Sequence, residues 1–400
     1  MDFDDSEQDA AFRREVASWL ADHATLRTGA GDWSRQTMDP DYPKRCREWQ
    51  HTLYEGGWGA ITWPVEYGGR GDSAWHQAIF NQEAAKYDVS VGVFAVGIGM
   101  CGPTLIAHGT EAQKQRFLPA MLRGEEIWCQ LFSEPDAGSD LAGLTTRARR
   151  DGDVFVVNGQ KVWTSGAQYS DWGILLARTN ADAPKHKGIT YFLVDMRTPG
   201  IEIRPLRQIT GDAHFNEEFL TDVVIPAENV VGTVDGGWAV THTTMSNERA
   251  LIGGGGGQIT VTQVADLARR VGKSKDPVIR QQIAAFYTRT ELLRFMNYRI
   301  QTAISHGRMP GPEASTTKLF ISQHASLTGE LVMELSGAHG MLADGSALDN
   351  GMWERAFLNQ WQTKIGGGTD NIQRNSLAER VLGLPREVRT DKDIPFSQLA

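Results

Sequence analysis

The sequence predicts a multidomain α+β protein in which an N-terminal helical domain, a middle antiparallel β domain and a C-terminal helical bundle follow one another. Three observations support this prediction. Apolar residues repeat at helical spacing near the start, short β-rich runs without an intervening helix fill the middle, and long helical segments return towards the end. We therefore divide the 400 residues into domains 1–125, 126–235 and 236–400.

The composition is that of an ordinary globular chain, with 40% hydrophobic residues, 22% charged residues and a formal net charge of -9. There is no basic block, which argues against a nucleic-acid partner. No apolar run reaches the roughly 18 residues that a membrane span needs. The acidic N-terminus is unlike a signal or transit peptide. Cys46, Cys101 and Cys129 are few and far apart, which is typical of reduced thiols, so we expect a cytoplasmic protein.

The N-terminal domain begins with Phe12, Val16, Trp19 and Leu20 at helical spacing. Segment 89–108 then combines few charges with small residues, and it predicts either a buried packing helix or the wall of an apolar pocket.

The β domain is predicted from several runs of β-branched and aromatic residues. Runs 154–157 and 160–163 flank Asn158-Gly159, a dipeptide that favours the tight turn of a hairpin because both positions need positive φ. Further strands are expected at 173–178, 190–194, 201–205 and 219–225.

The C-terminal domain is predicted to be helical, with prolines at several helix ends. The expected helices span 240–271, 277–306, 312–336, 352–364 and 370–383. Three glycines, Gly366 to Gly368, separate the last two of them. They predict either a helix cap or a loop whose backbone N–H groups approach a ligand.

The known nucleotide-binding loops are absent: there is no Gly-x-Gly-x-x-Gly between a strand and a helix, and no Gly-x-x-x-x-Gly-Lys. Metal-ligand spacings of His, Cys, Asp and Glu are missing as well. Instead, the polar stretch 130–143 resembles the first signature of the acyl-CoA dehydrogenase family. Segment 161–165 resembles that family's second flavin segment, and the resemblance extends over nearly the whole chain.

This resemblance implies an FAD cofactor and assigns residues to it. Phe132 and Ser133 match positions at the N1/O2 edge of the flavin, and Ser139 matches one near the ring and the pantetheine of the substrate. Trp163 would lie against the isoalloxazine, and Ser165 would bond near N5. The complete set of cofactor residues implied is Gln130, Phe132, Ser133, Ser139, Trp163, Ser165, Arg280, Gly337, Thr369 and Asn371. Of these, Arg280 would reach the pyrophosphate, often across a subunit interface, and Gly337 the adenine dinucleotide half.

The sequence departs from the family at Gly367, where many members carry the catalytic glutamate. Removal of an α-proton needs a carboxylate in a dry site, and glycine offers only an N–H that can donate to the thioester carbonyl. One subgroup, resembling isovaleryl- and long-chain acyl-CoA dehydrogenases, places the glutamate directly before an arginine on a helix after the β domain. Glu248 and Arg249 match that pair. The alternatives are that Glu248 is an acid in the first turn of a helix, or that Asp370 is the base.

The resemblance implies an FAD-dependent dehydrogenase that converts an acyl-CoA to a 2,3-enoyl-CoA, with Glu248 and Gly367 catalytic and Ser139 and Arg249 at the substrate. Arg249 on the protein surface, in a salt bridge, is an equally good interpretation. Two other functions stay open: a catalytically silent or FAD-binding subunit of a hetero-oligomer, and a flavin oxidase or monooxygenase. Expected partners are an electron-transferring flavoprotein and a homotetramer or dimer, with a hetero-oligomer as an alternative. The acyl group cannot be read from the sequence.

Overall fold

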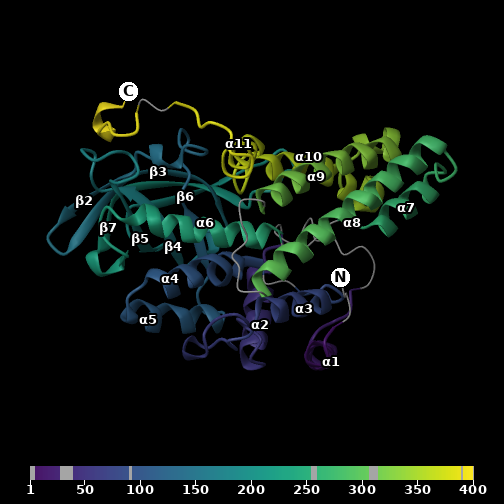
Figure 1. The fold of residues 1–400 in the computed structure, drawn as a ribbon, viewed down its shortest axis with the longest axis horizontal. Helices are drawn as coiled ribbons and strands as arrows, with labels where there is room; N and C mark the ends of the chain where they lie inside the picture. The colour runs from purple at the N-terminus through teal and green to yellow at the C-terminus, as the bar shows by residue number, and fades with distance from the viewer. Residues whose placement is uncertain are drawn as a thin grey trace.

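The computed structural model describes residues 5–27, 39–89, 92–253, 259–305, 314–388 and 391–399. A helical N-terminal part, a β-sheet part and a C-terminal helical bundle follow one another along the chain, as the sequence predicts (Figure 1). The domain boundaries at 125 and 235 remain our proposal.

The N-terminal part consists of five α-helices: α1 (Glu7–His23), α2 (Tyr42–Glu55), α3 (Ala74–Ala84), α4 (Gly102–His108) and α5 (Glu111–Leu122). Ser6 caps α1 by accepting a hydrogen bond from Asp9 N at 3.1 Å, and Phe12, Val16 and Leu20 are buried on one face of that helix. Segment 97–108 is a π-helical turn that leads into α4, and a Cβ added at Gly102 would lie 2.0 Å from the Trp63 ring. The small residue therefore permits close packing, as expected of a buried packing helix.

Eight strands form one sheet in the order β6-β7-β3-β2-β4-β5-β8, with β1 added beside β4. The pairs are antiparallel except for β1 with β4 and a short contact of β2 with β4, which are parallel. The strands are β1 (Trp128–Leu131), β2 (Arg147–Asp151), β3 (Val154–Ser165), β4 (Trp172–Arg178), β5 (Ile189–Asp195), β6 (Ile201–Leu206), β7 (Phe215–Pro226) and β8 (Val230–Val231).

The hairpin predicted at Asn158-Gly159 is wrong, because both residues lie inside the single strand β3. β3 is paired on both sides, with β2 and with β7, and the register shifts between Val157 and Gly159. The side chain of Asn158 reaches across to Asp222 at 3.0 Å. Two-sided pairing thus outweighs the local turn preference of the dipeptide, and the chain instead turns between β2 and β3 at Gly152, with φ 60°.

The C-terminal part contains α6 (Gly237–Gly253), α7 (Val261–Arg270), α8 (Pro277–Ser305), α9 (Ala314–Ser336), α10 (Met352–Ile365) and α11 (Asp370–Arg380). The single helix expected over 240–271 is therefore two helices, and residues 254–258 between them lie outside the described ranges. Phe286, Val332 and Trp353 form the bundle core with Val264. Among the described residues, no helix is long and apolar enough to cross a membrane.

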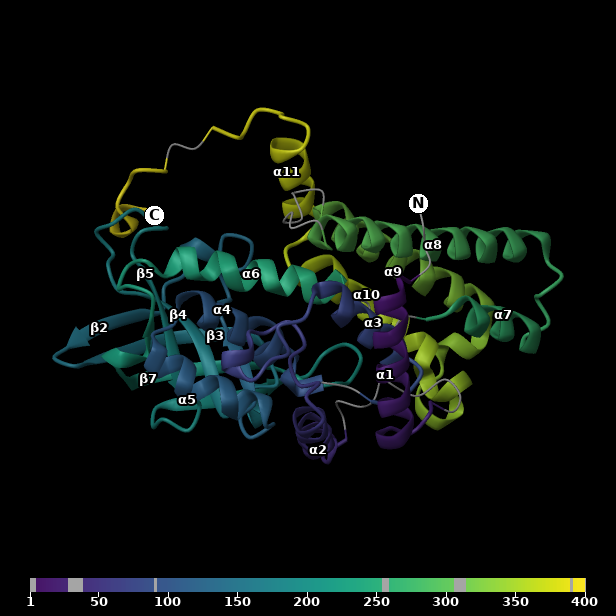
Figure 2. The ribbon, with the colours of Figure 1, turned by 60° about the horizontal axis from the view of Figure 1, so that its bottom comes forward.

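The helix α6 joins the two larger parts of the molecule. It contacts β5 in the sheet and α9 in the bundle, and α9 also contacts α10 and α11. Beyond α11 the chain returns to the β-sheet part, where residues 391–399 lie near its edge (Figure 2).

Candidate active site

The two expected flavin segments are held together by backbone. Ser133 O, after β1, accepts a hydrogen bond from Val162 N in β3 at 3.0 Å. The Phe132 side chain is buried against Tyr191, with ring centroids 5.9 Å apart, so its backbone and not its ring is placed for a ligand. Gln130 is half-buried in β1, whereas Ser139 is exposed at the far end of the loop.

A buried ion pair lies beneath this contact and was missed by the sequence analysis. Lys161 Nζ donates to Phe132 O and to Glu134 Oε1, both at 2.9 Å, and neither side chain is appreciably exposed. Burial raises the pKa of Glu134, but the Lys161 charge and hydrogen bonds from Thr145 and Thr146 outweigh it and lower that pKa to about 2. Burial also lowers the pKa of Lys161, with Glu134 opposing. Lys161 lies at the same alternate positions of β3 as the buried Phe155 and Val157. A lysine on the apolar face of a predicted strand is the signal that could have revealed this ion pair.

Trp163 has a left-handed backbone, with φ 66°, at a bulge in β3 between Val162 and Thr164. Its side chain is 59% exposed and meets Phe215 edge to face at 6.0 Å. A left-handed tryptophan costs on the order of 1–3 kcal/mol, and such strain clusters at functional sites. The bulge places a flat, accessible indole two residues from the exposed Ser165. This arrangement suits stacking on a planar ring beside a hydroxyl donor.

Segment 208–216 connects this region to the bundle. Arg355 Nη1 on α10 lies 2.8 Å from Asp212 Oδ1, and both side chains are 11% exposed. His214 O accepts a hydrogen bond from Gly166 N at 2.8 Å, directly after the Trp163 segment. The pair therefore fixes α10 relative to the strand that carries the indole.

The glycine loop between α10 and α11 is both a cap and a preorganised backbone turn. Gly367 and Gly368 have φ of 64° and 85°. Their carbonyl oxygens accept hydrogen bonds from Gln373 Nε2 at 3.1 and 3.4 Å. Thr369 caps α11 by accepting from Ile372 N at 3.2 Å. Within the part of the chain that the structure describes, no acceptor is hydrogen-bonded to Gly367 N–H.

Asn371 and Asp370 begin α11, next to this loop. Asn371 is exposed, and its Oδ1 accepts from Arg374 at 2.9 Å. The Asp370 carboxylate accepts from Ser322 Oγ at 2.6 Å and lies 3.5 Å from Lys318 Nζ and 3.8 Å from Lys364 Nζ. These contacts tie the Asp370 carboxylate to Ser322 and Lys318 on α9, so it anchors the start of α11 against that helix.

Glu248 is half-buried and lies in the second half of α6. The alternative that it is an acid in the first turn of a helix is wrong, because α6 already begins at Gly237. The helix α6 contacts α9, and α9 also contacts α10 and α11, between which Gly367 lies. The side chain of Arg249 lies outside the described residues.

Gly337 and Arg280, the residues expected at the adenine dinucleotide half and the pyrophosphate, lie apart in this chain. Gly337 lines a cavity of about 320 Å³ together with Arg270, Lys273 and His339. The guanidinium of Arg270 pairs with Asp349 at 2.9 Å. Arg280 is exposed near the start of α8 and does not line this cavity, so its contact with a flavin across a subunit interface stays a prediction.

The residues present fit FAD: an exposed indole at a strained bulge, the exposed hydroxyl of Ser165 two residues on, the glycine loop with its Gly367 N–H, and a cavity lined by Arg270 and Lys273. In the described ranges, no cluster of three or more His, Cys, Asp or Glu side chains could hold a metal ion.

Comparison with known proteins is consistent over the whole length. Three profiles of the acyl-CoA dehydrogenase family match: the N-terminal domain over residues 6–125, the middle domain over 129–223 and the C-terminal domain over 235–382. The chain is 40% identical to acyl-CoA dehydrogenase IpdE1 of Mycobacterium tuberculosis, covering 94% of this chain and 98% of that protein. It is 41% identical to FadE34 of the same organism, covering 94% of this chain but 51% of FadE34.

Two solved structures are similar as well. The Tcur3481-Tcur3483 steroid ACAD superposes with a TM-score of 0.83 at 31% identity, covering 97% of this chain and all (100%) of the other. The ChsE4-ChsE5 complex from Mycobacterium tuberculosis has a TM-score of 0.77 at 31% identity, with the same coverage of 97% and 100%.

Proposed function

The chain belongs to the acyl-CoA dehydrogenase family, whose members are FAD-dependent oxidoreductases acting on acyl-CoA, and we propose that it catalyses α,β-dehydrogenation of an acyl-CoA thioester to the 2,3-enoyl-CoA. The observation that carries the proposal is the placement of Glu248. Its helix, α6, contacts α9, and α9 also contacts α10 and α11, the two helices that flank the glycine loop lacking a carboxylate at Gly367.

In this mechanism, Glu248 accepts the α-proton of the thioester, and Gly367 N–H donates a hydrogen bond to its carbonyl oxygen. That hydrogen bond stabilises the negative charge that develops as the proton leaves. Bound FAD supplies the acceptor for the β-hydride. Trp163 and Ser165 hold and orient the planar ring, and the backbone at Ser133 fixes its other edge. We propose an electron-transferring flavoprotein as the external electron acceptor.

For the substrate, we propose an acyl-CoA whose acyl group bears fused rings. The support is that a structural neighbour at 31% identity is described as a steroid ACAD. A missing side chain at Gly97 or Gly99 permits space for such a group but does not select it.

For the assembly, we propose a hetero-oligomer with a second acyl-CoA dehydrogenase chain. The support is that one similar structure is described as the ChsE4-ChsE5 complex, and another, the Tcur3481-Tcur3483 steroid ACAD, is named for two chains. Large apolar side chains exposed on the bundle support an interface there. They include Tyr287, Leu292, Phe295, Trp361 and Ile365, at 53%, 45%, 42%, 54% and 66% exposure. Three buried free cysteines support our expectation of a cytoplasmic location.

The proposal is tested with Glu248→Gln in the protein purified together with its partner chain. We expect FAD to be retained and anaerobic flavin reduction by acyl-CoA to slow by about 10²–10⁴-fold, the usual contribution of a general base. The measurement is stopped-flow absorbance of the flavin, with straight, branched and ring-bearing acyl-CoAs as substrates. The largest wild-type rate is expected for a ring-bearing thioester.

Glu228→Gln, a change at an exposed acid between β7 and β8, is the control and should leave the rate unchanged. In the Glu248→Gln background, Gly367→Glu should restore part of the rate if both positions address one α-carbon, although the left-handed backbone at Gly367 disfavours a side chain. Reduction of Glu248→Gln at the wild-type rate would show that another residue is the base.

A further inference from the structure

The C-terminal segment 391–399 is bound to the β-sheet part by its own backbone. Phe396 N donates to Ala183 O at 2.9 Å, and Ser397 N donates to Ala181 O at 2.8 Å. The family's C-terminal profile ends at residue 382, so this contact lies beyond the region that the profile describes. The segment therefore adds contacts to the sheet that the family match does not account for.

Beneath this segment, Arg178 on β4 is buried, and its guanidinium binds carbonyl oxygens. Nε donates to Leu144 O at 3.1 Å, Nη2 to Ala142 O at 2.6 Å and Nη1 to Lys185 O at 3.1 Å. Burial lowers the pKa of Arg178 to about 10, so the group remains charged at neutral pH. The Phe396 ring covers the guanidinium, with 3.5 Å from Cζ to the ring centroid. Excluding water in this way strengthens the hydrogen bonds beneath.

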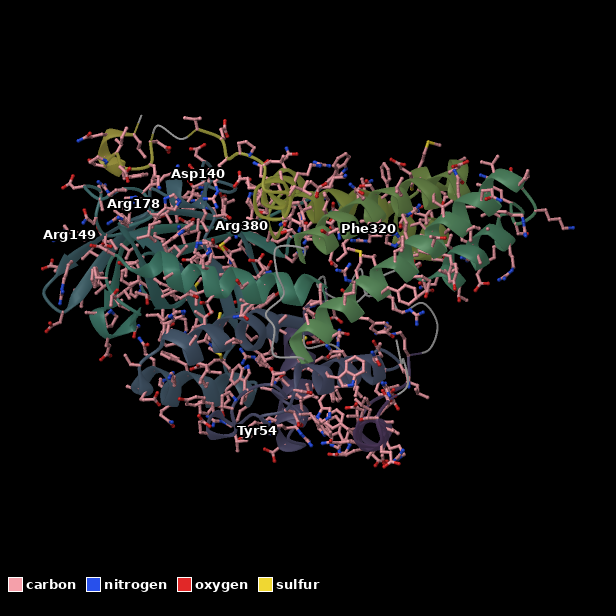
Figure 3. The ribbon with its side chains drawn as sticks, viewed as in Figure 1. Tyr54, Asp140, Arg149, Arg178, Phe320 and Arg380 are labelled. Carbon is pink, nitrogen blue, oxygen red and sulfur yellow. The ribbon has the colours of Figure 1, made fainter. Side chains whose placement is uncertain are left out.

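Two of these carbonyl oxygens, those of Ala142 and Leu144, belong to the C-terminal end of loop 133–144. This loop carries Ser133 and Ser139, the serines expected at the flavin and the thioester. A second contact reinforces the first: Asp140 in the loop pairs with Lys185 at 2.8 Å, and Lys185 also lies 3.2 Å from Asp391 of the C-terminal segment. Figure 3 shows Asp140 and Arg178 in the same region of the sheet, next to the yellow C-terminal segment. Two cations thus connect the end of the chain to this loop.

We propose that Arg178 and Phe396 are positioning residues for the reaction. Phe396 shields Arg178 from water, and Arg178 fixes loop 133–144 in the conformation in which Ser139 meets the CoA thioester. The identity of the ligand as a CoA thioester rests on the proposed function, whereas the effect of Phe396 and Arg178 on the conformation of the loop rests on the contacts alone.

Phe396→Ala tests the proposal in the full-length protein with its partner chain. We expect KM for the acyl-CoA thioester to rise about ten-fold, equivalent to about 1.4 kcal/mol, with kcat nearly unchanged. Amide hydrogen exchange in 139–146 should accelerate, while exchange in α8 and α9 stays at the wild-type rate. A defect in overall stability would instead accelerate exchange throughout the chain.

Phe219→Ala is the matched control, because Phe219 lies over Arg204 at 4.4 Å in the same sheet. Arg204 is 53% exposed and pairs with Glu202, so it holds no loop carbonyl. The control should change neither KM nor exchange in 139–146. Unchanged exchange there in Phe396→Ala, or equal KM changes in both variants, overturns the proposal. Accelerated local exchange in a protein that oxidises no acyl-CoA would leave the positioning intact and reject the proposed function.

Discussion

Glu218 on β7 is a fully buried acid directly across the sheet from Lys161 on β3. Thr164 Oγ1 donates to its Oε2 at 2.7 Å, and Thr164 follows the Trp163 bulge. Burial raises the pKa of Glu218 to about 7, against the lowering effects of Thr164 and Lys161 and with a further raising effect of Glu217. A titratable carboxyl therefore lies behind the segment expected to hold the flavin.

Stability should depend on pH through Glu218. Its folded pKa, about 7, is above the ordinary value of 4.5, so the folded state holds the proton more tightly. The stabilisation is complete below pH 4.5 and is lost as pH rises through 7, a change on the order of 3 kcal/mol. Denaturant unfolding at pH 5 to 8 should show this decline in wild type and a flatter profile in Glu218→Gln. The neighbour variant Glu217→Gln should keep most of this decline, because burial, the largest cause of the raised pKa of Glu218, is unchanged.

The strand β3 shows how an element can override its own local signals. Asn158-Gly159 is favourable for a turn, yet the strand continues because β2 and β7 hydrogen-bond to it on both sides. Gly159 is needed for a different reason from the predicted one. A Cβ there would lie 2.4 Å from Thr146 Oγ1 and 2.7 Å from Thr146 Cα, so the glycine allows close approach of two backbones.

Gly159→Ala should therefore destabilise the protein by about 2 kcal/mol or more, because the neighbouring strand must shift. Gly152→Ala is the comparison: that residue has φ 60°, but a Cβ there meets nothing within 4 Å. Its cost should be about 1 kcal/mol, from the left-handed backbone alone. Thermal unfolding of both variants measures the difference, and a smaller loss for Gly159→Ala than for Gly152→Ala would contradict the packing argument.

The proposed site is assembled from two of the three parts of the molecule, the β-sheet part and the C-terminal helical part. The indole comes from the sheet, Glu248 from the helix that leaves it, and the glycine loop from the end of the bundle. The ion pair of Asp212 with Arg355 joins the sheet to α10, which ends at that loop. The chemistry depends on how these parts are held relative to one another.

Asp212→Asn should weaken this connection. Removing one partner of a largely buried pair leaves the other charge without compensation, at a cost of about 3 kcal/mol. We expect a lower unfolding midpoint and loss of FAD on desalting. Glu202→Gln, which breaks the exposed pair with Arg204, should leave the unfolding midpoint nearly unchanged. Full FAD retention by Asp212→Asn would show that the pair does not hold the site together.

The order of the three parts and most helix positions could be predicted from the sequence, because they depend on periodicity and on prolines at helix ends. The segments expected at the flavin could be predicted because they are short contiguous motifs that resemble those of the family. The family resemblance singled out Gly367 as lacking a carboxylate and directed attention to Glu248. The local turn preference of Asn158-Gly159 was misleading, because both residues lie inside one strand.

Which residues far apart in the sequence contact each other became visible in the tertiary structure alone. The pairs Lys161 with Glu134, Asp212 with Arg355, and Arg178 with Phe396 are each separated by many residues in sequence. None of these pairs can be recognised from the local sequence, since the identity of a charged or aromatic residue does not tell whether its side chain is solvated or buried. Burial removes water from these groups and makes their partners obligatory, and burial is a property of the packed fold.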